Sequence, residues 1–108
     1  GRGKDLIITG GYNVYPKEVE VEIDALPGVV ESAVIGVSHP DFGEGVTALV
    51  VRKPGADIDE RGILQALEGR LAKYKQPKRV LFVDELPRNT MGKVQKNLLR
   101  DEHKALFA

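Results

Sequence analysis

Three short apolar runs, separated by polar segments that contain glycine and proline, constrain the fold of this chain most. Residues 29–37, 46–51 and 80–83 are rich in valine, isoleucine and leucine. They are long enough for central strands and too short for convincing helices. The first two runs follow each other along the chain with a polar loop, residues 38–45, between them, so we expect them to pair.

The segment that begins at Pro16 is ambiguous between helix and strand. Its acids alternate with β-branched residues, which is typical of a strand. However, Pro16 suits a first helical turn, acids there suit the helix dipole, and Val19 and Ile23 fall on one helical face. We therefore predict a helix that ends near residues 26–28.

Two further helices are predicted from apolar periodicity. Asp59 is a plausible N-cap, with Ile58 and Ile63 placed as a hydrophobic staple for the helix that follows. After Lys93 the pattern again becomes helical. The residues expected on one side of this last helix are Val94, Leu98, Leu99, Ala105 and Leu106.

The start of the chain predicts a β-hairpin. Residues 5–9 and 12–15 suit short strands, and Gly10-Gly11 breaks them at or near a turn. The glycine pair is equally consistent with a purely structural turn and with a functional role. The predicted fold class is therefore α+β, with an N-terminal β-hairpin plus a three-stranded, mainly antiparallel sheet packed with three helices.

Composition limits the class of protein. A length of 108 residues suits one domain, 1–108, and 42% apolar residues provide a core without disulfides, since cysteine is absent. Lys plus Arg equals Asp plus Glu, 16 each, so no overall basic field favours nucleic acid or an anionic membrane. Without cysteines, a signal peptide or an apolar membrane span, we predict a cytoplasmic location.

The loop at residues 38–45 contains a weak candidate metal or acid-base cluster. His39 lies near Asp41 and Glu44, but no second histidine or cysteine supplies a recognisable ligand spacing. The alternative is a loop whose polar residues satisfy turn geometry. We predict no metal site in this domain.

Lys93 is the best candidate for chemistry. It lies on a short irregular loop between a strand, which should stop at Pro87, and the last helix. Most lysines are simply solvated, but an ammonium on a flexible stem can also reach carboxylate or phosphate oxygens as charge develops on them. Gly92 beside it permits an unusual turn.

A dense basic segment, residues 73–79, carries no acid. It contains Lys73, Lys75 and Lys78. One interpretation is a solvated linker whose lysines stabilise a helix C-terminus. The sharper interpretation is a contact with phosphate groups or with a partner domain.

Two motifs resemble signatures of the adenylate-forming superfamily, which includes acyl-CoA synthetases. Residues 87–93, Pro-Arg-Asn-Thr-Met-Gly-Lys, resemble its last signature, and residues 1–20 resemble one that begins at its interdomain hinge. The resemblance covers essentially the whole chain. It implies the small C-terminal domain of such an enzyme, with a large N-terminal domain as its partner.

The resemblance implies roles for individual residues. Lys93 would be the catalytic lysine of adenylation, Arg2 would hold the nucleotide, and Lys4 matches the hinge. Gly10 and Gly11 would line the channel for the pantetheine thiol. The lysines that would contact the phosphates of coenzyme A are Lys73, Lys75 and Lys78.

The resemblance also implies substrates and regulation. ATP and Mg would bind mainly to the large domain, and coenzyme A would accept the acyl group of a small carboxylic acid. The wording Arg-Asn-Thr-Met-Gly-Lys is most similar to malonyl-CoA synthetases. Lys93 would also be an acetylation site for a lysine acetyltransferase and a deacetylase, because residues 87–93 match the pattern that such enzymes recognise in this family.

Two other classes of protein remain as alternatives: a nucleic-acid-binding module that uses residues 73–79, and a stand-alone protein-interaction domain. The first would require strongly salt-dependent affinity for RNA or DNA. The second would need no chemistry at Lys93.

Overall fold

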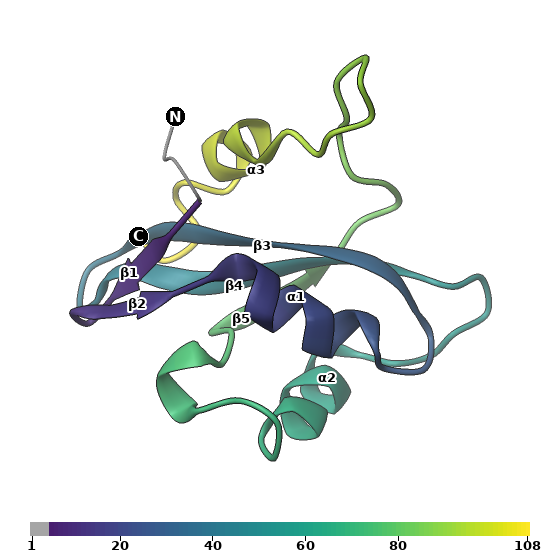
Figure 1. Cartoon of the computed structure of the whole chain (residues 1–108), viewed down its shortest axis with the longest axis horizontal. Coiled ribbons are helices and arrows are strands. Elements are labelled where there is room, and N and C mark those ends of the chain that lie inside the picture. Colours follow the sequence, from purple (N-terminus) through teal and green to yellow (C-terminus); the bar gives the residue numbers. More distant parts are fainter. Residues whose placement is uncertain (1–4) are drawn as a thin grey trace.

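The computed structural model describes residues 5–108, which form one sheet with helices on both of its faces (Figure 1). In chain order the elements are β1 (Ile7–Thr9), β2 (Tyr12–Val14), α1 (Pro16–Asp24), β3 (Val29–His39), β4 (Gly43–Arg52), α2 (Glu60–Leu67), the 3₁₀ helix η1 (Lys73–Lys75), β5 (Arg79–Phe82) and α3 (Lys96–Glu102). The predicted α+β class is confirmed.

β4 organises the sheet. It pairs with β3 antiparallel along nearly its whole length and with β5 parallel from Thr47 to Val50. The β1–β2 hairpin was predicted as a separate unit beside three strands, but Thr9 of β1 pairs with Gly43 of β4. The sheet therefore has five strands. β1 pairs with β4 at Gly43, which lies outside the stretch from Thr47 to Val50 that pairs with β5.

The connection between β3 and β4 is tighter than predicted. Residues 38–45 were expected to form a polar loop, but Ser38 pairs with Glu44 and His39 with Gly43. Gly43 has a φ of +79°, a conformation that glycine adopts without strain. Only residues 40–42 remain for the turn, because backbone pairing continues into the polar residues on either side of it.

One face of the sheet is covered by α1 and α2. Val19 and Ile23 of α1 are fully buried whereas Val21 is 51% exposed, so the ambiguous acidic segment is a helix, as predicted. Asp59 is confirmed as the N-cap of α2, since its carboxylate accepts the Gly62 amide at 2.8 Å. These helices bury a core with strand residues such as Val34, Val46 and Val50.

The other face is covered by α3 and the segments around it. Leu99 and Leu86 pack here on Ala33, Ile35 and Leu49. The helix begins at Lys96 rather than directly after Lys93, because Val94 is held in a bridge with Arg88. Leu98, which was expected on the apolar side, is 47% exposed. Among residues 5–108, no helix is long and apolar enough to cross a membrane.

Candidate active site

The Lys93 loop, residues 88–94, lies between β5 and α3 outside any helix or strand, as predicted, and forms a compact reversal of the chain. Arg88 and Val94 form a bridge, and the Asn89 amide donates to the Lys93 carbonyl at 3.0 Å. The Gln95 amide closes the base of the loop on the Pro87 carbonyl at 2.8 Å. Backbone pairing therefore fixes both stems of the loop.

Asn89 fixes the tip of the loop. Its Oδ1 accepts the amides of Met91 at 2.9 Å and Lys93 at 3.0 Å. Gly92 supports this turn with a φ of +82°, so glycine is required here for its conformation. The Lys93 side chain remains exposed while its backbone is held. A fixed backbone, with an ammonium that has no ion pair among residues 5–108, suits a lysine that reaches into a partner surface.

The Gly10-Gly11 pair forms the β1–β2 turn, as predicted. Both glycines have positive φ, +57° and +85°. The Gly10 amide donates to the Phe42 carbonyl at 2.9 Å, and a Cβ on Gly10 would lie 3.3 Å from the Phe42 ring. Gly11 has nothing within 4 Å of the position that a Cβ would take. The turn thus presents bare backbone.

The basic segment, residues 73–79, folds against this turn. The Tyr74 ring stacks on the Tyr12 ring with centroids 4.7 Å apart, and Lys78 Nζ lies 3.9 Å from the centroid of the Phe42 ring. Together these residues line a pocket of about 140 Å³ beside Gly10. The sequence did not reveal this arrangement. Each of the three aromatic residues has a lysine or a glycine next to it in the sequence, but the contacts join residues that are far apart in the sequence.

The three lysines of this segment differ in their contacts. Lys75 Nζ pairs with Glu18 at 2.8 Å, and this hydrogen bond raises the pKa of Lys75. Lys78 lies over the Phe42 ring, while Lys73 is exposed and has no ion pair within residues 5–108. Lys73 and Lys78 are therefore better placed than Lys75 to contact an added anion.

The two candidate surfaces lie at different ends of the domain (Figure 1). The segment between β5 and α3 extends away from the sheet at the upper right, whereas the β1–β2 turn lies at the left. Arg2 and Lys4, the predicted nucleotide and hinge residues, lie outside the described residues. Within residues 5–108, the structure does not bring Lys93 and Gly10-Gly11 into one site.

Asp5, the first described residue, contacts the last helix. It adopts a φ of +60°, and its carboxylate lies 3.7 Å from Arg100 Nη1 and 3.9 Å from Lys96 Nζ. Lys96 also pairs with Glu20 at 2.7 Å, and Glu20 accepts the Val34 amide at 2.8 Å. α3 therefore forms ion pairs with Asp5, the residue directly after the predicted hinge position Lys4.

The His39 cluster has a turn role. His39 Nδ1 accepts the Asp41 amide at 3.1 Å, and the His39 ring packs on Phe42 and Phe107. Glu44 points elsewhere and accepts the Ile8 amide at 2.9 Å. No group of three or more His, Cys, Asp or Glu side chains in the described part of the chain could hold a metal ion.

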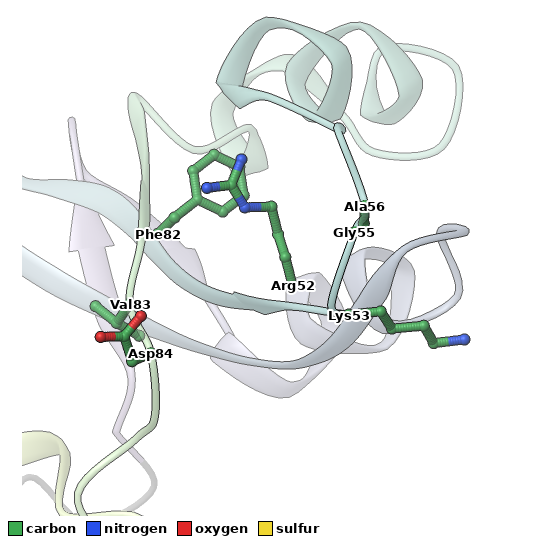
Figure 2. Close-up of a pocket in the computed structure, with 7 residues that line it drawn as sticks. All are labelled: Arg52, Lys53, Gly55, Ala56, Phe82, Val83 and Asp84. Carbon is green, nitrogen blue, oxygen red and sulfur yellow. The ribbon is translucent and has the colours of Figure 1, made fainter.

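A second pocket, of about 360 Å³, lies near the end of β4 (Figure 2). The Arg52 guanidinium covers the Phe82 ring, 4.0 Å from its centroid, and donates to the Ile58 carbonyl at 3.1 Å. In Figure 2 the Lys53 side chain points away from the other side chains. The Arg52 guanidinium is thus occupied by contacts with Phe82 and Ile58. The residues that line this pocket do not form a cluster of catalytic groups.

Known proteins share both the sequence and the fold. The family model of the AMP-binding enzyme C-terminal domain matches residues 18–93. A 3-[(3aS,4S,7aS)-7a-methyl-1,5-dioxo-octahydro-1H-inden-4-yl]propanoyl:CoA ligase of Rhodococcus jostii is 52% identical over 95% of the chain and 20% of its own length. The long-chain-fatty-acid--CoA ligase FadD13 of Mycobacterium tuberculosis is 45% identical over 96% of the chain and 20% of its own length.

Solved structures agree. Apo MatB from Rhodopseudomonas palustris is 71% identical, with a TM-score of 0.96 over 100% of this chain and 22% of that one. The ATP-bound form of MatB gives 70% identity and a TM-score of 0.97, over the same shares of the two chains. The chain spans about a fifth of the length of the curated relatives it matches. It belongs to the AMP-binding enzyme C-terminal domain family, whose members here are acyl-CoA ligases.

Proposed function

We propose that this chain is the mobile C-terminal domain of an acyl-CoA synthetase that converts a carboxylate, ATP and coenzyme A into acyl-CoA, AMP and pyrophosphate. The single observation that best supports this function is the arrangement of Lys93, whose backbone is fixed by Asn89 while its side chain is exposed. Family membership and the acyl-CoA ligases among the relatives point the same way.

In the first step, Lys93 acts on the reacting anions. A carboxylate oxygen attacks the α-phosphate of ATP, and pyrophosphate leaves. The Lys93 ammonium bridges carboxylate and phosphoryl oxygens, which offsets repulsion where two anions meet. Arg2 holds the nucleotide. Mg and most of the ATP site belong to the large domain.

In the second step, the domain presents its other surface. It rotates about Lys4 so that the Gly10-Gly11 turn replaces the Lys93 loop at the reaction centre. The coenzyme A thiol passes the bare backbone of the turn and displaces AMP from the acyl-adenylate. Lys73 and Lys78 contact phosphates of coenzyme A, and Lys75 contributes less because Glu18 already neutralises it.

The acid substrate is malonate. The supporting observations are the resemblance of residues 88–93 to malonyl-CoA synthetases and the 71% identity to MatB. The acyl pocket itself lies in the large domain. The enzyme acts in the cytoplasm.

Acetylation of Lys93 switches the first step off. The modification removes the charge of the ammonium, and a deacetylase restores it. The exposed position of Lys93 gives an acetyltransferase access to it. Pro87, Arg88 and Gly92 supply the recognition pattern.

The test is Lys93→Ala in the enzyme that contains this domain together with its large domain. Adenylation should fall on the order of 100- to 1000-fold, as for the loss of one preorganised charge donor, while thioester formation from supplied acyl-adenylate is retained. Lys104→Ala is the control, since Lys104 is an exposed lysine that lies near His39 and Pro40, away from the Lys93 loop. Equal losses in both steps would contradict the assignment. The isolated domain should show no pyrophosphate–ATP exchange.

A further inference from the structure

Arg88 joins the Lys93 loop to the sheet. Both of its terminal nitrogens donate to the Glu31 carboxylate, with Nη1 3.1 Å from Oε2 and Nη2 bonded to Oε1. Its Nε donates to the Gly92 carbonyl at 3.2 Å. A single side chain thus connects β3 to the residue directly before Lys93, and it does so through the planar, two-point geometry that only arginine offers.

A β-bulge in β3 places Glu31 for this contact. Val29 pairs with Arg52 and Glu31 pairs with the adjacent Val51, so Val30 is the extra residue. Val29 belongs to the core under α1 and α2, whereas Ala33 belongs to the core under α3. The bulge reverses the alternation of side chains and turns Glu31 to the same face as Ala33.

Val94, at the C-terminal end of the loop, packs against the core under α3. The orientation of the rest of the loop depends on few contacts. Its own hydrogen bonds, which the Met91 and Lys93 amides donate to Asn89 Oδ1, make it one unit, but they do not attach that unit to the sheet. Gln95 and Pro87 hold its base, and Arg88 is the side chain whose hydrogen bonds reach from the loop to β3. The pair is partly shielded, with side chains 40% and 28% exposed, and Arg88 lowers the pKa of Glu31.

We propose that Arg88 and Glu31 are a positioning pair that sets the direction in which Lys93 leaves the sheet during adenylation. The inference rests on the proposed function of Lys93. Arg88 touches no reacting atom and acts through the loop. Its role therefore depends on Glu31, which distinguishes it from an arginine that binds substrate or the large domain directly.

Arg88→Lys and Glu31→Gln, made in the two-domain enzyme, test this pair. Each should lower kcat for adenylation roughly 10- to 100-fold, the range expected when a reacting group is misplaced, with little change in KM. Thioester formation from acyl-adenylate should stay as in the unmodified enzyme. The double variant should be no worse than the poorer single variant, since each removes the same contact. Arg70→Lys and Glu22→Gln are matched controls from an exposed pair between other elements.

Hydrogen exchange provides a readout that does not depend on catalysis. The amides of residues 88–94 should exchange faster in both variants than in the unmodified enzyme. In both controls their exchange rates should stay unchanged. If Lys93→Ala left adenylation intact, the proposed function would fail. Hydrogen exchange would still show whether the Arg88–Glu31 pair holds the loop in place. The positioning role is overturned if Glu31→Gln keeps normal adenylation while Arg88→Lys loses it, or if loop exchange is unchanged in both.

Discussion

The Tyr12 and Tyr74 rings stack with centroids 4.7 Å apart, which joins the β1–β2 hairpin to the basic segment, residues 73–79. Through this stack, two segments far apart in the sequence form one surface beside Gly10. The surface combines bare turn backbone, aromatic rings and lysines. This is the surface that the proposed function assigns to the coenzyme A thiol.

Removal of the stack should affect the thioester step. Tyr74→Ala deletes a stacked ring, which costs stability by about 0.5–1.5 kcal/mol beyond the area it buries, and releases the basic segment from the hairpin. We expect slower transfer from acyl-adenylate to coenzyme A, with adenylation preserved. Tyr15→Ala is the control, because Tyr15 is similarly exposed and makes no ring contact among the described residues. Equal effects of both variants would contradict this role.

A comparison of alanine substitutions at Gly11 and Gly55 separates the effect of backbone strain on stability from an effect on the thioester step. Their φ values are +85° and +81°, and neither has an atom within 4 Å of the position that a Cβ would take. Alanine at either should cost about 1–2 kcal/mol of unfolding free energy because of the left-handed backbone. Only Gly11→Ala should also slow the thioester step. Stopped-flow kinetics and urea unfolding measure the two effects, and a slow Gly55→Ala enzyme would argue against a role for the turn surface.

Acetylation should concentrate at Lys93. An amine must be deprotonated to attack acetyl-CoA, and the Glu18 hydrogen bond raises the pKa of Lys75, which keeps that amine protonated. Lys78 is in contact with the Phe42 ring, whereas Lys93 projects from its loop. Incubation of the two-domain enzyme with an acetyltransferase, followed by mass spectrometry, should locate the label at Lys93. A label spread evenly over Lys73, Lys75, Lys78 and Lys93 would refute selective modification.

Glu60 should make stability depend on pH in the acidic range. Its pKa lies below the usual value of 4.5 because its carboxylate accepts the Val80 amide and Arg79 at 2.8 Å each. A carboxyl with a lowered folded pKa stabilises the protein fully above its unfolded pKa, and the contribution is lost as pH falls through the folded value.

Glu60→Gln should therefore lower the unfolding free energy at pH 7 and flatten its decline below pH 4.5. Urea unfolding at a series of pH values measures both. Glu68→Gln, at the exposed C-terminal end of the same helix, is the control and should keep the original slope. If Glu60→Gln left the slope unchanged, the bonds to Val80 and Arg79 would not stabilise the fold.

Much of the fold was predictable because its signals are local. The apolar runs of β3, β4 and β5, the Pro16 start of α1 and the Asp59 cap of α2 each depend on neighbouring residues, and each was confirmed. The two motifs at residues 1–20 and 87–93 also lie within continuous segments, so the family could be identified from sequence and was then supported by the match over residues 18–93. The roles of Lys93, Gly10 and Gly11 remain predictions.

Only the tertiary structure decided how these segments combine. Hydrogen bonding across strands joined the hairpin to β4 and shortened the loop at residues 38–45, because backbone groups pair whatever their side chains are. The bulge at Val30, the Arg88–Glu31 contact and the Tyr12–Tyr74 stack each unite residues distant in the sequence. Such contacts depend on register and on the path of the chain in space, which no local pattern encodes.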